Sequence, residues 1–145
     1  MAAAAASISP SRIPKTRDKE GSEGAAKAHV LIVEDNELVT AALRILFEET
    51  GRRVTVAHSV AEAVSAGEAD PPDLLLLDLT LPDGDGLEVV QSLAKRGVKP
   101  KATVALTGRD DPESRKRCSA AGITAVMVKP VPTTELLRKT KEWLD

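Results

Sequence analysis

The chain has 145 residues, of which 42% are hydrophobic and 29% charged, so it is long enough for one domain with a sizeable core and too short for two. Its 20 basic and 22 acidic residues give a formal net charge of -2, which excludes a global electrostatic attraction to nucleic acid or to a membrane surface. No apolar stretch approaches the roughly 18 residues of a membrane span, and the single cysteine, Cys118, has no partner for an internal disulfide. We therefore expect a cytoplasmic protein.

The first part of the chain differs in composition from the rest. Residues 1–27 combine Ala, Ser, Pro, Gly and mixed charges, with Ile8 and Ile13 as sizeable apolar side chains. Such a segment buries too little apolar surface to offset the entropy lost on ordering. We predict a disordered tail over residues 1–27 and one folded domain over residues 28–145.

From Ala28 onward, short apolar runs alternate with segments of helical periodicity. The N-cap sequence Asp111-Pro112-Glu113 opens one helix, which closes at Gly122, and Gly51 is a stop signal for another. Strands alternating with helices are typical of an α/β fold, here a three-layer αβα sandwich around a five-stranded parallel sheet. In chain order, the predicted elements are strand 28–33, helix 37–50, strand 53–57, helix 60–68, strand 74–77, helix 86–95, strand 102–106, helix 111–122, strand 125–128 and helix 133–144.

Charged side chains follow three of the predicted strands. Asp78 comes directly after a run of four leucines, Glu34-Asp35 follows the first strand, and Lys129 follows the last. The carboxyl ends of parallel strands meet at one edge of the sheet, which is where ligands bind in open α/β folds. We therefore expect three acids and one base to lie together at that edge.

Four motifs occur in order along the chain: Glu34-Asp35, Asp78, Thr107 and Lys129-Pro130. With the segment that follows Asp78, they resemble the receiver domain of two-component response regulators, in the single-domain form of chemotaxis regulators. The resemblance covers about residues 28–145. It implies the flavodoxin-like strand order 2-1-3-4-5, which brings the acids after strands 1 and 3 into one crevice.

The clustered carboxylates predict a cation site, because they repel one another unless a cation neutralises them, and hard oxygen ligands suit Mg²⁺. We assign Asp35 and Asp78 as direct ligands and Glu34 as a ligand through water. The resemblance adds the backbone carbonyl of Thr80. No other cofactor is expected.

The resemblance also implies a reaction and a partner. A histidine kinase or a histidine phosphotransfer protein would donate a phosphoryl group to Asp78, with Lys129 and Thr107 contacting the transferred oxygens. The protein would then catalyse its own phosphorylation and dephosphorylation without acting on a separate metabolite. No output segment follows the last predicted helix, so the signal would pass through contacts with an unknown partner protein.

Further positions in the resemblance concern switching. The hydroxyl of Thr107 would bind the phosphoryl group, and Gly108 beside it would leave the site open. Arg109 occupies a position that tunes dephosphorylation, and Lys129-Pro130 is a cis peptide bond in the family. At Val126 the family commonly has an aromatic side chain, so the usual aromatic readout of the switch is missing.

Other functions stay open on the sequence alone. One is a phosphorylation-independent adaptor that keeps the fold. Another is a phosphatase of the haloacid dehalogenase type, although that family has a second Asp where this chain has Thr80.

The basic run Arg115-Lys116-Arg117 is either a partner surface or a solvated helix face. A stand-alone regulator, a relay shuttle and a module of a larger kinase all stay open, and the N-terminal tail slightly favours a stand-alone protein.

Overall fold

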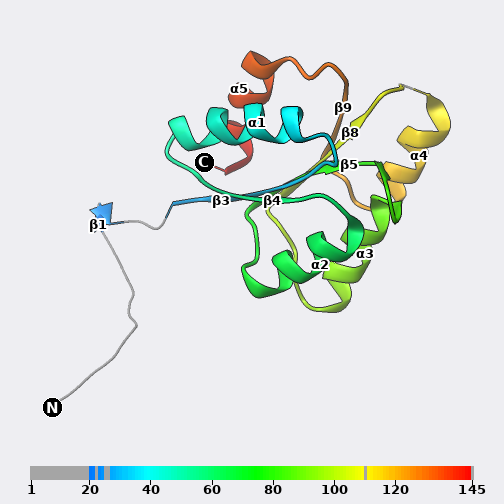
Figure 1. Ribbon diagram of the computed structural model, residues 1–145, viewed down its shortest axis with the longest axis horizontal. Helices are drawn as coiled ribbons and strands as arrows, with labels where there is room; N and C mark the ends of the chain where they lie inside the picture. The colour runs from blue at the N-terminus through cyan, green and yellow to red at the C-terminus, as the bar shows by residue number, and fades with distance from the viewer. Residues whose placement is uncertain (1–19, 22, 25–26, 110, 145) are drawn as a thin grey trace, which may run out of the picture.

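The computed structural model in Figure 1 describes residues 20–21, 23–24, 27–109 and 111–144. Its centre is a parallel sheet in the order β4-β3-β5-β8-β9, which is the predicted order 2-1-3-4-5. The α/β fold expected from the sequence is therefore confirmed. The strands are β3 (His29–Val33), β4 (Arg53–Ala57), β5 (Leu74–Asp78), β8 (Ala102–Thr107) and β9 (Ala125–Val128), and the helices are α1 (Glu37–Glu49), α2 (Val60–Ala69), α3 (Leu87–Lys95), α4 (Pro112–Ala120) and α5 (Thr133–Leu144).

The helices cover both faces of the sheet, with α1 and α5 on one face and α2 and α3 on the other (Figure 1). Helix α4 lies on the α3 side, since its Cys118 packs with Leu87 of α3 and Ala105 of β8. The leucines of β5 serve both faces, because successive side chains of a strand point in opposite directions. Leu74 and Leu76 pack in the cluster that contains the α1 residue Phe47, whereas Leu75 and Leu77 pack in the cluster on the α2 and α3 side. All four leucines are fully buried, which explains the continuous apolar run.

Local signals account for the helix ends. The side chain of Asn36 accepts hydrogen bonds from the N–H groups of Leu38 and Val39 at the start of α1. Asp111 does the same for α4 through the N–H of Ser114 at 2.8 Å. Gly51 has φ +84°, the left-handed backbone that terminates α1.

One element was not predicted. Between β5 and α3, the strands β6 (Thr80–Leu81) and β7 (Gly84–Asp85) form a short antiparallel ribbon. At its tip, the Asp83 carboxylate accepts hydrogen bonds from the N–H groups of Val60 and Ala61, at 2.7 and 3.1 Å. The ribbon is therefore held against the start of α2.

The predicted tail falls mostly outside the described residues. Two short strands within it, β1 (Glu20–Gly21) and β2 (Glu23–Gly24), pair with each other in antiparallel fashion. Disorder over residues 1–27 stays a prediction. In the described part of the chain, no helix has the length and apolarity needed to cross a membrane.

Candidate active site

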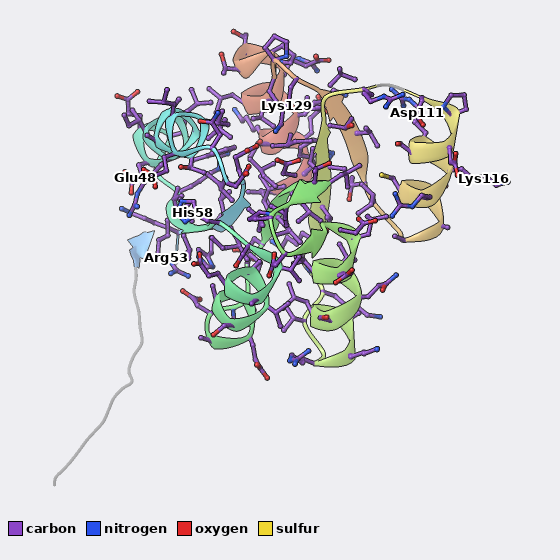
Figure 2. All side chains as sticks on the ribbon, turned by 45° about the vertical axis from the view of Figure 1, so that its right-hand side comes forward. Glu48, Arg53, His58, Asp111, Lys116 and Lys129 are labelled. Atoms are coloured by element: carbon purple, nitrogen blue, oxygen red, sulfur yellow. The ribbon has the colours of Figure 1, made fainter. Side chains whose placement is uncertain are left out.

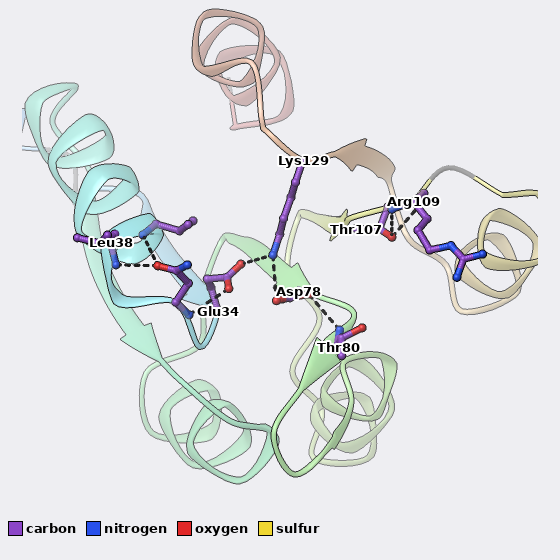
Figure 3. A network of polar contacts seen from close by, with 9 residues as sticks. Glu34, Leu38, Asp78, Thr80, Thr107, Arg109 and Lys129 are labelled. Carbon is purple, nitrogen blue, oxygen red and sulfur yellow. Dashed lines mark hydrogen bonds and ion pairs between the residues drawn. The ribbon is translucent and has the colours of Figure 1, made fainter.

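The sheet register brings the predicted site residues to one edge. Glu34 follows β3, Asp78 ends β5, Thr107 ends β8 and Lys129 follows β9. Asp78 lies opposite Leu106 in the next strand, and Thr107 lies opposite Val128, so the strand ends are level with one another. Figure 3 shows Lys129 reaching down from the end of β9 between Glu34 and Asp78.

An ion-pair network joins these three side chains. Lys129 Nζ donates to Glu34 Oε1 at 2.6 Å and to Asp78 Oδ2 at 3.1 Å. The side chain of Glu34 is 1% exposed and that of Asp78 is 9% exposed, so both carboxylates are largely removed from water. The second oxygen of Glu34 accepts the N–H of Asn36 at 3.1 Å. Buried carboxylates need such partners, and Lys129 supplies one to each of them.

The network shifts the protonation equilibria of its members. Burial raises the pKa of Glu34, and the charge of Asp78 adds to this rise, while hydrogen bonds from Lys129 and Asn36 oppose it. Burial also disfavours the charged form of Lys129, but its hydrogen bonds and attraction to Glu34 and Asp78 prevail and raise its pKa. Lys129 therefore carries a full positive charge beside Asp78 at neutral pH.

The other Asp78 oxygen is held by the loop that follows. Asp78 Oδ1 accepts the N–H of Thr80 at 3.0 Å. The loop then turns back so closely that a Cβ on Gly86 would lie 2.1 Å from the Asp78 carbonyl oxygen. Only glycine fits there, a constraint that the sequence alone does not reveal. Gly86 is thus a site residue that could not be identified from the sequence, where it stands only at the start of the predicted helix 86–95.

Three carboxylates could hold a metal ion. One oxygen each of Glu34, Asp35 and Asp78 lie within 4.8 Å of one another, and Asp35 is exposed to solvent. This all-oxygen set fits Mg²⁺, which binds through one or two carboxylates and retains several waters. Because Glu34 is buried and already paired with Lys129, its assignment as a ligand through water suits its position. The part of the Thr80 carbonyl in metal binding stays a prediction.

Thr107 is separate from this cluster. Its hydroxyl donates to the Arg109 carbonyl at 3.0 Å and accepts the Arg109 N–H at 3.2 Å (Figure 3). Among the described residues, no hydrogen bond joins Thr107 to Asp78. A Cβ on Gly108 would meet nothing within 4 Å, so this side of the site is open. The one hydroxyl proton of Thr107 is therefore committed to the Arg109 carbonyl.

The last two predicted switch positions lie on and beyond β9. The Lys129-Pro130 peptide bond is cis. Val126 is half-buried and packs beside Leu87, Ala105 and Cys118, beneath α4. Its aliphatic side chain has no hydroxyl or ring with which to report a movement of Thr107.

Comparisons with known proteins agree with this geometry. The family model for the response regulator receiver domain matches residues 30–141. The chain is similar to an uncharacterized 14.6 kDa protein of Leptolyngbya boryana, with 33% identity over 81% of this chain and 91% of that protein. It is also 33% identical to the KDP operon transcriptional regulatory protein KdpE of Escherichia coli, over 74% of this chain and 47% of that protein. This chain thus spans about half the length of several curated relatives that it matches.

Two solved structures have the same fold. A CheY-like receiver domain protein from Methanospirillum hungatei has a TM-score of 0.75 and 29% identity, over 83% of this chain and 95% of that chain. The receiver domain of the sensor histidine kinase PA1611 from Pseudomonas aeruginosa has a TM-score of 0.70 and 28% identity, over 82% of this chain and 98% of that chain. The latter was solved with a magnesium ion coordinated in its active site cleft.

Proposed function

Because this chain belongs to the response regulator receiver domain family, we propose that Asp78 accepts a phosphoryl group from a phosphohistidine in a Mg²⁺-dependent reaction. The donor would be a histidine kinase or a histidine phosphotransfer protein, and the phosphorylated domain would signal through contact with a further protein. The single observation that carries this proposal is the hydrogen bond from Lys129 to the Asp78 carboxylate at the carboxyl edge of the sheet. A cytoplasmic location stays a prediction.

The chemistry requires an ionised Asp78 and compensation of charge. An Asp78 oxygen attacks phosphorus, and the bond from phosphorus to the donor nitrogen breaks as the new bond to oxygen forms, leaving the imidazole of the donor. Lys129 lies within hydrogen-bond distance of Asp78, so its charge is in place to offset the negative charge on the transferred oxygens.

The proposed metal ligands are Asp35 and Asp78 directly, Glu34 through water, and the Thr80 carbonyl. When bound, Mg²⁺ neutralises charge on the phosphoryl oxygens and orients them. The magnesium site of the PA1611 receiver domain supports this assignment. The hydrogen bond from Lys129 fixes Glu34 and favours its charged form, whereas burial raises the pKa of Glu34 and favours its protonated form.

Thr107 is the proposed switch. Its hydroxyl is satisfied by the Arg109 backbone in one arrangement, and a phosphoryl oxygen on Asp78 would satisfy it in another. The phosphoryl group has differential affinity for the two arrangements, which is what a population shift requires.

The test is direct labelling. With Mg²⁺ and acetyl phosphate, the protein should gain one base-labile phosphate, seen as a single added phosphoryl mass. Asp78→Asn should abolish the gain, whereas Asp70→Asn, at the opposite edge of the sheet, should keep it. Failure of the unmutated protein to gain phosphate would reject the proposal.

A phosphorylation-independent adaptor is the second candidate. The observation that favours it is Val126, where the aromatic readout is missing. Labelling at Asp78 would decide against this candidate. A phosphatase of the haloacid dehalogenase type is disfavoured because Thr80 stands where that family has its second Asp.

A further inference from the structure

One ion pair joins the loop after Asp78 to helix α4. Asp85, in strand β7, pairs through Oδ2 with the guanidinium of Arg117 on α4. Its other oxygen, Oδ1, accepts the N–H of Leu87 at 2.9 Å, at the start of α3. Asp85 therefore holds together the phosphoacceptor loop, α3 and α4.

The same loop binds the Asp78 carboxylate. Thr80 in β6 lies opposite Asp85 in β7, and the Thr80 N–H donates to Asp78 Oδ1 at 3.0 Å. A continuous hydrogen-bonded path therefore runs from the carboxylate of Asp78 through the ribbon to Arg117. A displacement of the ribbon would move both ends of this path.

Helix α4 buries little of its side-chain surface among the described residues. Cys118 is its one fully buried side chain among the described residues. Asp85 and Arg117 line a groove of about 390 Å³ between α3 and α4, so space is available for α4 to shift. A helix with so little buried surface has few packing contacts to resist a shift, and the ion pair with Asp85 contributes to its position.

We propose that Asp85 is a positioning residue whose ion pair with Arg117 couples the Asp78 site to the position of α4. The inference rests on the proposed function, because it assigns a readout to that same site. It also gives a path from the Asp78 site to α4 that needs no aromatic side chain, whereas the usual readout needs an aromatic residue where this chain has Val126. Coupling of this kind is reciprocal, so changes at Arg117 must alter ligand affinity at Asp78.

Affinity at the site is the first measurement, with Mg²⁺ and beryllofluoride as the probe for the phosphorylated state. Arg117→Ala should weaken probe binding about fivefold or more, at the lower end of typical coupling between sites. Lys116→Ala is the matched control, because it removes the same charge from the exposed side of α4 (Figure 2) and should change binding less than about twofold. Equal effects of the two substitutions would overturn the proposal.

A double-mutant cycle separates coupling from a general loss of structure. Asp85→Asn keeps an oxygen to accept the Leu87 N–H but loses the charge that pairs with Arg117. It should weaken probe binding like Arg117→Ala, and the double variant should be no weaker than either single variant. Additive losses would show that the two residues act independently and would overturn the proposal.

Hydrogen exchange gives a readout that affinity alone does not. In the unmutated protein, the probe should change the protection of α4 amides, and Arg117→Ala should abolish that change while the variant stays folded. Probe binding and labelling at Asp78 without any response in α4 would overturn the inference and leave the proposed function intact. Absence of probe binding in the unmutated protein would overturn both.

Discussion

Helices α1 and α4 both begin a few residues after predicted site residues, and they are packed against the rest of the domain very differently. Each follows a strand that ends in site residues: Glu34 and Asp35 precede α1, and Thr107 precedes α4. Helix α1 buries Thr40, Leu43 and Phe47, whereas α4 buries only Cys118 among the described residues.

The difference separates two tasks. The carboxylates of the proposed metal site would have to be held at fixed positions, and the well-packed face of α1 helps to fix the chain that carries Glu34 and Asp35. The proposed switch requires Thr107 to change partners, and the weakly packed α4 beside it would permit this change. The proposed metal-dependent chemistry therefore depends on the well-packed α1, and the proposed switching of Thr107 depends on the weakly packed α4.

Truncating the buried side chain of each helix tests this contrast and has the largest expected effect. Phe47→Ala should lower the free energy of unfolding by about 3–5 kcal/mol, because it leaves a large cavity in the core. Cys118→Ala should cost about 1 kcal/mol, the value of roughly one methylene-sized group. Urea denaturation measures both, and equal losses would contradict the contrast.

The loop between β5 and α3 should be the next most sensitive position. Gly86→Ala should cost about 2–3 kcal/mol, because the new Cβ would meet the Asp78 carbonyl oxygen, which cannot move without displacing β5. It should also reduce labelling at Asp78. Gly108→Ala is the control, with an expected change below about 0.5 kcal/mol, since open space surrounds that glycine. A stable Gly86→Ala protein would show that the loop is adaptable.

The smallest expected effect concerns the cap that Asp83 supplies to α2. Hydrogen bonds from the N–H groups of Val60 and Ala61 lower the pKa of Asp83 below its usual 3.8. The ionised carboxylate therefore adds stability that is fully present above pH 3.8 and is lost as the pH falls through the lowered pKa. Asp83→Ala should lower the urea midpoint at pH 7, and the difference from the unmutated protein should narrow in acid.

Asp83→Asn is the matched variant for this cap. It keeps an acceptor oxygen for the α2 N–H groups and loses the titration, so its difference from the unmutated protein should depend less on pH than that of Asp83→Ala. An equal dependence on pH in both variants would mean that Asp83 is not the group responsible.

Much of the fold could be predicted because its signals are local. Apolar runs mark the strands, and the predicted cap Asp111 lies three residues before the N–H group that it binds. The meeting of Glu34, Asp78 and Lys129 followed from the rule that parallel strands end at one edge. When each residue follows a strand of the same parallel sheet, the sheet brings the side chains together at one edge.

The features that were missed depend on the path of a loop. A strand of two residues is too short to show a periodic pattern, so the ribbon that starts at Thr80 could not be predicted from the sequence. Asp83 binds N–H groups more than twenty residues away, and Asp85 pairs with Arg117, 32 residues away. The attachment of Thr107 to the Arg109 backbone depends on how one short loop turns. The contacts of Asp83 and Asp85 follow from tertiary geometry, which no local pattern encodes.

The sharing of β5 between the two faces of the sheet has a practical consequence. The leucines of β5 pack alternately against both helix layers, so detaching either layer would expose leucines of the strand that both layers share. The domain should therefore unfold in one cooperative transition. The single tryptophan, Trp143 on α5, packs against the cluster that contains Leu76. Its fluorescence should therefore report unfolding of the entire domain. A ligand at Asp78 that binds only the folded state would raise the denaturation midpoint seen by this distant side chain, without an added label.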